Sequence, residues 1–269
     1  MSESSIAFSK EIRKTVLKMV FEANASHIGG TLSMADILAV LYYGALNIDP
    51  KNPKDENRDR LFLSKGHACT GLYATLGLKG FFDIKDLDNY SKNDSLLLSH
   101  VSHKVNGVEL STGSLGHALP VACGVALAAK RKNKSFKIVT ILSDGELDEG
   151  SNWEAILFAP QHKLDNLIAI VDYNKIQSFG SVKEVIDLDP LNKKFEAFNW
   201  NVIEIDGHDH EQITKAIKKA KSNTIKPTVI IANTIKGKGI DFMENQLLWH
   251  YKSPTKEQYQ QALEHLNNN

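Results

Sequence analysis

The sequence predicts an α/β fold with a mainly parallel sheet flanked by helices on both faces. Two runs rich in β-branched apolar residues, 138–142 and 167–171, have the composition of buried strands. Residues 151–162 between them have the composition of a crossover helix. Further strand signals at 60–64, 201–205 and 228–232 alternate with helical segments. This alternation is typical of a parallel sheet between two helical layers.

The expected helices lie on both sides of these strands along the chain. Ser33 is expected to cap the second helix, with Asp36 in its first turn. A short loop precedes that helix at residues 26–30, and a polar, Pro-containing loop follows at residues 49–59. The remaining helical segments are expected at residues 4–24, 33–43, 68–78, 84–90, 114–132 and 211–221.

Length, charge and cysteine content restrict the class of protein. A chain of 269 residues suits one domain over residues 1–269. The 32 basic and 32 acidic side chains balance, so no net charge favours nucleic acid. Two cysteines are too few for a disulfide framework, and no secretion signal or membrane-spanning segment is evident. We expect a cytoplasmic protein without nucleic-acid or membrane partners.

Polar turns follow the two central strands. Ser-Asp-Gly occupies positions 143–145, and Asp-Tyr-Asn occupies positions 172–174. If these strands are parallel neighbours, Asp144 and Asn174 emerge at one edge of the sheet, where open α/β sheets bind ligands. A carboxylate and an amide oxygen suit a Mg²⁺ ion that keeps positions for phosphate oxygens, and Gly145 lets a diphosphate approach the backbone. The alternative is a pair of ordinary turns.

The stretch from Asp144 to Asn174 resembles the thiamine-diphosphate motif, which begins Gly-Asp-Gly and ends in Asn about thirty residues later. Ser143 replaces the first glycine of that motif. From near residue 6 to about residue 260 the chain resembles the N-terminal, pyrophosphate-binding part of transketolase. The resemblance implies thiamine diphosphate as cofactor and a divalent ion held by Asp144, Asn174 and the backbone carbonyl of Ile176. The ion is expected to be Mg²⁺, although oxygen ligands also accept Ca²⁺ or Mn²⁺.

A second segment, Thr-Gly-Ser-Leu-Gly at 112–116, resembles the transketolase segment that lies along the cofactor. By this resemblance Gly113 and Leu115 contact thiamine diphosphate through their main chain. His117 stands where the family has Gln, so its side chain is not assigned a contact. Glu149 matches a family glutamate that joins two active sites across a dimer interface, although acidic residues are also common at helix starts.

Four of the ten histidines match positions of active-site imidazoles in transketolases. Each alone is more often a structural or surface residue, but a cluster of neutral imidazoles can bind sugar hydroxyls and move protons. The resemblance implies that His27 and His250 lie near the substrate carbonyl. It places His67 near the diphosphate and His100 near the donor hydroxyls.

The resemblance also implies a partner and a reaction. Transketolases need a second domain that binds the aminopyrimidine ring, and no second α/β block follows here. We therefore expect a subunit of a split transketolase, active only with a pyrimidine-domain subunit in a two-plus-two heterotetramer. It would transfer a two-carbon ketol unit from a ketose or ketose phosphate to an aldose. The alternatives are the α subunit of a 2-oxo acid or acetoin dehydrogenase, and a non-catalytic regulatory paralogue.

Two departures from the family pattern fall beside the expected substrate end of the site. Val101 and Ser102 follow His100 where relatives have Pro-Glu, and Tyr251 follows His250 where relatives commonly have Gly. The predicted metal end keeps its ligands. The hypothesis is that cofactor chemistry is retained while the donor or acceptor differs from the usual sugar phosphates.

Overall fold

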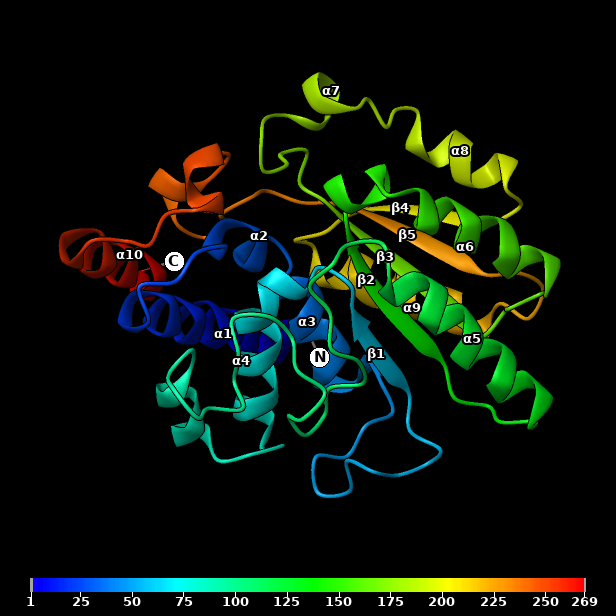
Figure 1. Ribbon diagram of the computed structural model, residues 1–269, viewed down its shortest axis with the longest axis horizontal. Coiled ribbons are helices and arrows are strands. Elements are labelled where there is room, and N and C mark those ends of the chain that lie inside the picture. Colours follow the sequence, from blue (N-terminus) through cyan, green and yellow to red (C-terminus); the bar gives the residue numbers. More distant parts are fainter. Residues whose placement is uncertain (1, 269) are drawn as a thin grey trace.

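The computed structural model describes residues 2–268, and one five-stranded parallel sheet lies at its centre (Figure 1). The order across the sheet is β1-β2-β3-β5-β4, and each neighbouring pair is parallel. The parallel sheet predicted from the sequence is confirmed, and all five expected strands belong to it. They are β1 (Arg60–Leu63), β2 (Ile138–Ser143), β3 (Leu167–Tyr173), β4 (Asn201–Asp206) and β5 (Thr228–Asn233).

Alternating side chains of the central strands enter two separate cores. In β2, Val139 and Ile141 pack into the core beside α1 (Ser2–Glu22), whereas Leu142 packs into the opposite core. Strand β3 repeats this pattern, and every one of its residues is buried. This two-residue period explains why both runs are apolar except at Thr140, since neither face of the two central strands meets water.

Helices cover both faces (Figure 1). The layer that includes α1 also holds α2 (Ile28–Ser33), α3 (Ala35–Val40), α4 (Cys69–Lys79), α9 (His210–Ser222) and α10 (Lys256–Asn268). The other layer holds α5 (Ala118–Arg131), α6 (Gly150–Gln161), α7 (Val182–Val185) and α8 (Leu191–Ala197). Shorter helical turns are Leu41–Ala45, Gly66–Ala68, Ile84–Asn89, Gly145–Asp148, Asp241–Met243 and Leu247–His250. None of the helices within residues 2–268 has the length and apolar character needed to cross a membrane.

The expected helix over residues 33–43 is wrong in its start and in its cap. Helix α2 begins at Ile28, inside the expected loop, and α3 begins only at Ala35. Ser33 ends α2, and its hydroxyl donates to the carbonyl of Gly30 at 3.0 Å and to Asp172 at 2.5 Å. The Ser33 hydroxyl, which the sequence pattern assigned to a helix cap, thus bonds to the buried carboxylate of Asp172 in β3.

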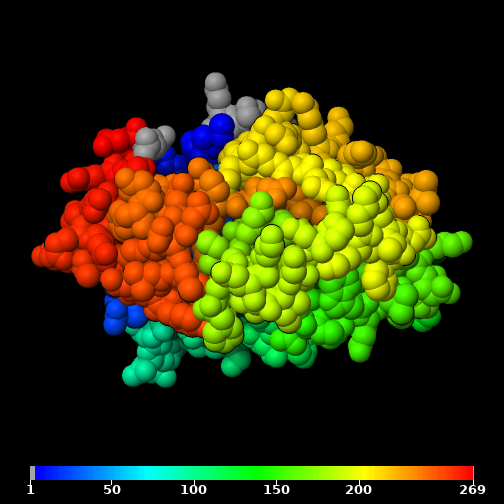
Figure 2. All heavy atoms as spheres, turned by 90° about the horizontal axis from the view of Figure 1, so that it is seen from above, coloured from blue at the N-terminus to red at the C-terminus, as the bar shows by residue number. Residues whose placement is uncertain are grey.

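One further boundary differs from expectation, and three helices were not expected. The expected helix 114–132 starts at Ala118, because residues 112–117 run as an irregular segment past the edge of the sheet. Helices α7, α8 and α10 were not expected from the sequence. Figure 2 shows the segment after β3 and the segment after β5 side by side on one face of the molecule. The candidate site lies where such strand ends meet.

Candidate active site

A cavity of about 230 Å³ lies at the carboxyl edge of the sheet. Residues that follow β1, β2, β3 and β5 contribute to it. Every site residue expected from the sequence except Glu149 lines this cavity. The lining residues are His27, Gly30, Lys65, His67, His100, Gly113, Leu115, Ser143, Asp144, Gly145, Asn174, Ile176, Gln177, Ser178, Lys236, His250 and Tyr251.

Asp144 follows β2 and is only 2% exposed. Its Oδ1 accepts the N–H of Gly145 at 2.7 Å, and its Oδ2 accepts the N–H of Lys175 at 2.6 Å. Burial, with the charge of Asp172 in addition, raises the pKa of Asp144 to about 6. A carboxylate held in low dielectric without a full counter-charge is a group that a cation would stabilise.

Asn174 and Ile176 follow β3 and offer two further oxygens. Asn174 is 5% exposed, and its Oδ1 accepts the N–H of Ile176 at 3.1 Å. The carbonyl of Ile176 accepts a hydrogen bond from the ammonium of Lys236 at 2.8 Å. With Asp144, these groups form a set of carboxylate, amide and carbonyl oxygens of the kind that hard divalent cations bind.

Among residues 2–268, no three His, Cys, Asp or Glu side chains are grouped around a common metal position. The expected ligand set does not require such a group, because only Asp144 in it is a carboxylate. Glycine is needed at position 145, since a Cβ there would lie 2.9 Å from the side chain of Gln177. The turn can therefore pack closely against the segment after β3.

A buried ion pair lies beside the cavity. Asp172 in β3 accepts the ammonium of Lys65 and the hydroxyls of Ser33 and Thr234. Both charged side chains are 1% exposed or less. Burial alone would raise the pKa of Asp172, but the charge and hydrogen bond of Lys65 hold it below its ordinary value. Lys65 also donates to the carbonyl of Gly30 at 2.6 Å, so this pair links β1, β3 and α2.

The four expected histidines also come together at the cavity. The ring of His27 lies 5.0 Å from that of His67, 6.2 Å from that of His100 and 5.2 Å from that of His250, measured between ring centroids. The rings of His67 and His250 are 5.7 Å apart. Tyr251 lies edge-on to His250 at 4.7 Å and is 60% exposed.

Three of these imidazoles are neutral at physiological pH. Burial, followed by the charges of His100 and Lys236, lowers the pKa of His27 to about 4. Burial and the charge of Lys236 lower the pKa of His250 to about 3. Burial and the nearby Lys65 lower the pKa of His67 well below its ordinary value. Each of the three rings can therefore donate one hydrogen bond and accept another, which suits recognition of hydroxyl groups.

The second predicted cofactor segment passes the same histidines. Gly113 lies against His100, where a Cβ would approach Cδ2 of the ring to 3.3 Å. Leu115 lines the cavity, and its carbonyl hydrogen-bonds to Nδ1 of the exposed His117 at 2.8 Å. His117 does not line the cavity.

Glu149 lies outside the cavity. It is an exposed residue that immediately precedes α6. Three residues earlier, Glu146 is fully buried and accepts hydrogen bonds from the Ser64 hydroxyl and from the N–H of Gly116 at 2.9 Å. Glu146 therefore anchors the turn after β2 to the segment that contains Leu115, whereas Glu149 is exposed at the start of α6.

Sequence reasoning missed Lys65, Asp172, Gln177 and Lys236. Lys236 is 2% exposed, and burial lowers its pKa to about 8. Its ammonium donates to the carbonyls of Ile176 and Gln177 and hydrogen-bonds to Nδ1 of His250 at 3.0 Å. The available signal was its place four residues after the last expected strand, 228–232, in Lys-Gly-Lys-Gly.

A family model for the transketolase thiamine-diphosphate-binding domain matches residues 4–266. The chain belongs to the transketolase family. It is 43% identical over 270 positions to a 6-deoxy-6-sulfo-D-fructose transketolase subunit of Clostridium sp. strain MSTE9, covering 99% of this chain and 98% of the relative. It is 45% identical to an apulose-4-phosphate transketolase subunit of Actinobacillus succinogenes, covering 96% and 94%. These relatives favour the transketolase interpretation over the dehydrogenase alternative.

Solved transketolases share this fold. The Campylobacter jejuni enzyme superposes with a TM-score of 0.91 at 37% identity, covering 97% of this transketolase chain but 43% of that enzyme. The Leishmania mexicana enzyme gives a TM-score of 0.92 at 27% identity, covering 98% and 41%. The α/β fold with its parallel sheet is thus the fold of one part of a longer transketolase.

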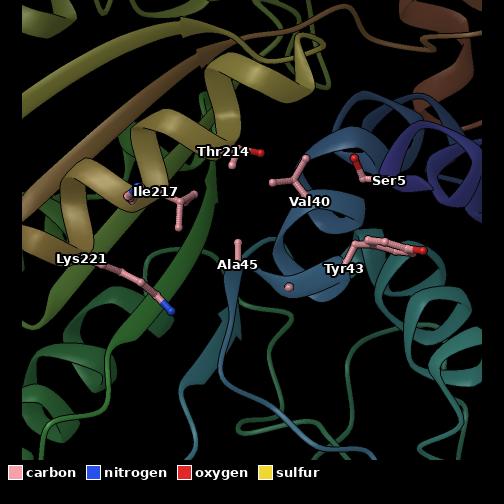
Figure 3. Close-up of a pocket in the computed structure, with 9 residues that line it drawn as sticks. Ser5, Val40, Tyr43, Ala45, Thr214, Ile217 and Lys221 are labelled. Carbon is pink, nitrogen blue, oxygen red and sulfur yellow. The ribbon is translucent and has the colours of Figure 1, made fainter. Parts of the chain in front are cut away.

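Another cavity, of about 360 Å³, lies between α1, the turn Leu41–Ala45 and α9 (Figure 3). None of the residues that line it is a predicted site residue. They are Ser5, Val40, Tyr43, Gly44, Ala45, Thr214, Ile217, Lys218 and Lys221. The chemistry expected of a transketolase therefore points to the cavity at the sheet edge.

Proposed function

We propose that this transketolase chain is the pyrophosphate-binding subunit of a two-subunit enzyme that transfers a two-carbon ketol unit from a ketose, or ketose phosphate, to an aldose. The observation that carries the proposal is the convergence of an oxygen-ligand set and four imidazoles on one cavity. One end suits a diphosphate with its metal, and the other suits a polyhydroxylated substrate.

The metal end fits a divalent cation. Asp144, Asn174 and the carbonyl of Ile176 are the proposed ligands, and phosphate oxygens and water would complete the coordination. Mg²⁺ is the proposed ion, with Ca²⁺ and Mn²⁺ as substitutes to be tested. Gly145, Gly113 and Leu115 would contact the cofactor through their main chain. The ammonium of Lys236 lies next to the Ile176 carbonyl, where it can also neutralise phosphate charge.

Thiamine diphosphate, when bound, supplies the nucleophilic carbon that ketol transfer requires. The chain's own part is to bind and orient. His67 would hydrogen-bond near the diphosphate, and His27 and His250 would lie near the substrate carbonyl. His100, on the exposed side of the cavity, would bind donor hydroxyls. The neutral state of His27 and His250 suits hydrogen bonds to uncharged groups of the substrate.

A partner subunit is part of the proposal. The solved transketolases are more than twice as long as the part that this chain matches, and the relatives from Clostridium and Actinobacillus are named as subunits. The first turn of α6 begins next to Glu149, and Leu157 in that helix is 64% exposed. We propose a two-plus-two heterotetramer in which Glu149 reaches across an interface and this single domain contacts a pyrimidine-domain subunit.

The relatives suggest which sugars to test. They are named for 6-deoxy-6-sulfo-D-fructose and apulose 4-phosphate, both of which carry an anionic group. Tyr251, at one departure from the transketolase pattern, lines the cavity beside His250, whereas Ser102, at the other, is buried and does not line it. Ketoses with a sulfonate or phosphate at the far carbon are therefore the proposed donor class. The two cysteines are both free and buried, which agrees with the reducing cytoplasm as the proposed location.

Reconstitution tests the proposal. The chain is mixed with a candidate pyrimidine-domain subunit, for instance one encoded next to its gene, plus thiamine diphosphate and Mg²⁺. We expect turnover of 6-deoxy-6-sulfofructose, apulose 4-phosphate or xylulose 5-phosphate with an aldose acceptor only when both subunits are present. Decarboxylation of a 2-oxo acid would instead support the dehydrogenase alternative. Complex formation without thiamine-dependent turnover would support a regulatory paralogue.

A further inference from the structure

A buried carboxylate outside the cavity receives four hydrogen bonds. Asp36, on α3, is 5% exposed. Arg13 donates to its two oxygens at 2.9 and 2.6 Å. His208 lies 2.7 Å and His210 lies 3.1 Å from the same carboxylate. Burial alone would raise the pKa of Asp36, but these donors hold it well below its ordinary value. The carboxylate is therefore ionised and fully occupied, and it is not a free ligand site.

Two of these donors also hold the backbone of the segment after β5. Nε2 of His208 accepts the N–H of Ile235 at 2.8 Å. Nε of Arg13 donates to the carbonyl of Lys238 at 3.0 Å. Between these two attachment points lies Lys236, whose side chain enters the cofactor cavity. Asp36 thus holds both groups that fix the backbone on either side of this lysine.

The hydrogen-bond partners assign the tautomer of His208. Because the N–H of Ile235 is a donor, Nε2 must be the acceptor, and the ring hydrogen resides on Nδ1. Asp36 accepts that hydrogen. Without the carboxylate, the ring of His208 could carry its hydrogen on Nε2 instead. The Nε2–H would then face the N–H of Ile235, and no hydrogen bond could form between them. Asp36 therefore selects the form of His208 that holds Ile235.

We propose that Asp36 is a positioning residue for Lys236. Acting through His208 and Arg13, it fixes residues 235–238 so that the lysine ammonium stays beside the Ile176 carbonyl and His250, at the diphosphate end of the cavity. This inference depends on the proposed function in one respect, namely that the ligand of the cavity is thiamine diphosphate.

His210 provides a matched control. It hydrogen-bonds to Asp36 as His208 does, and its Nδ1 lies 2.8 Å from the Ser5 hydroxyl. Among the hydrogen bonds of residues 2–268, none joins the ring of His210 to residues 235–238. A purely structural role for the cluster would make the two histidines equivalent, whereas positioning of Lys236 requires His208 alone.

Hydrogen exchange of the full-length chain without ligand tests the link to the backbone. His208→Ala should speed exchange at the Ile235 amide about tenfold, because the loss of its hydrogen bond favours local opening. Asp36→Asn should do the same. His210→Ala should leave this amide as in the wild type. His208→Gln, whose carboxamide can donate to Asp36 and accept from Ile235, should restore protection.

Titration of the full-length chain with thiamine diphosphate in the presence of Mg²⁺ tests the link to Lys236. His208→Ala should weaken binding about tenfold, and His210→Ala should not. Lys236→Met should also weaken binding. If His208 acts through the lysine, adding His208→Ala to Lys236→Met should cost no further affinity, and the two effects should be non-additive.

Three results would overturn the proposal. The first is an equal effect of His208→Ala and His210→Ala on exchange or on cofactor affinity. The second is unchanged exchange at the Ile235 amide in both His208→Ala and Asp36→Asn. The third is an additive loss of cofactor affinity when His208→Ala is combined with Lys236→Met. A wild-type chain that binds no thiamine diphosphate, even with its partner subunit, would instead overturn the proposed function. The exchange comparison would still decide whether Asp36 holds the backbone around Lys236.

Discussion

The carboxylate of Asp144 accepts the backbone N–H of Lys175 at 2.6 Å, and this bond joins the turn after β2 to the turn after β3. The adjoining residue, Asn174, therefore lies in a turn attached directly to Asp144. The remaining lone pairs of the carboxylate are free for a cation. One side chain thus joins the two strand ends that carry the proposed metal ligands.

Replacing Asp144 should therefore abolish metal-dependent cofactor binding. We expect Asp144→Ala to weaken Mg²⁺-dependent binding of thiamine diphosphate at least about a hundredfold, because it removes a charged ligand oxygen. Calorimetric titration measures the affinity, and circular dichroism checks that the fold is kept. Asp148→Ala is the control, since it lies in the same turn but does not line the cavity. Binding by the Asp144 variant at wild-type affinity would remove the metal assignment.

The same carboxylate should make the metal-free protein less stable as the pH rises. Burial and Asp172 raise the pKa of Asp144 from 3.8 to about 6. Between these values the folded state holds a proton that the unfolded state releases, so the free energy of unfolding falls with rising pH, by up to roughly 3 kcal/mol. Urea denaturation in EDTA from pH 4 to 7 measures this change. Asp144→Asn should not show it, and parallel profiles for the variant and the wild type would contradict the prediction.

The histidine cluster should act in the opposite direction. The pKa of His27 is lowered from 6.5 to about 4 and that of His250 to about 3. Below pH 6.5 the unfolded state takes up protons that the folded state does not, so the free energy of unfolding falls as the pH drops toward 4. The double variant His27→Gln, His250→Gln should lose less stability in that range. An NMR titration that found either imidazole with a pKa above 6 would disprove this account.

The ion pair between Lys65 and Asp172 should be costly to break. Asp172→Ala leaves a buried ammonium without its partner and should lower the free energy of unfolding by about 3–5 kcal/mol. Removing both charges, as in Lys65→Met with Asp172→Leu, should recover part of that loss. The partly exposed pair of Lys130 and Asp165 is the control, and Lys130→Ala should cost no more than about 1 kcal/mol. Equal losses at the two pairs, measured in urea, would be inconsistent with this prediction.

Tyr251 should affect substrate choice without affecting cofactor binding. Its ring stands edge-on to His250, is 60% exposed, and makes no hydrogen bond to a predicted metal ligand among those that the described residues form. In the reconstituted enzyme, Tyr251→Gly should change the ratio of kcat/KM between a sulfonated and a phosphorylated donor about tenfold. Tyr251→Phe should keep the wild-type ratio. An unchanged ratio in the glycine variant would exclude a role for this ring in specificity.

The sequence predicted the sheet and its ligand edge well, for a physical reason. Strands buried on both faces must be apolar throughout, so residues 138–142 and 167–171 are visible without any tertiary information. The carboxyl ends of parallel strands meet at one edge, which brings Asp144 and Asn174 into the same cavity. The histidine cluster was predicted from the family resemblance, and the structure brings its four rings together.

The remaining features depend on contacts between distant parts of the chain. Ser33 looked like a helix cap because its preferred partner, Asp172, is 139 residues away. Lys236 reaches the cavity because the segment after β5 crosses beside the segment after β3, and no local pattern reports that crossing. Helix α8 has seven residues and depends on packing against the sheet, whereas α7 starts with a local signal that the sequence analysis overlooked, the capping box of Ser181 and Glu184.

The first and last histidines of the site are also joined through their backbones. The N–H of His27 donates to the carbonyl of His250 at 2.9 Å, and His27 has a positive φ of 68°. The conformation that aims the first imidazole into the cavity is thus supported by a residue 223 positions later. During synthesis on the ribosome, this pocket cannot form until residue 250 has left the exit tunnel. Coenzyme loading is therefore expected to follow the emergence of that residue.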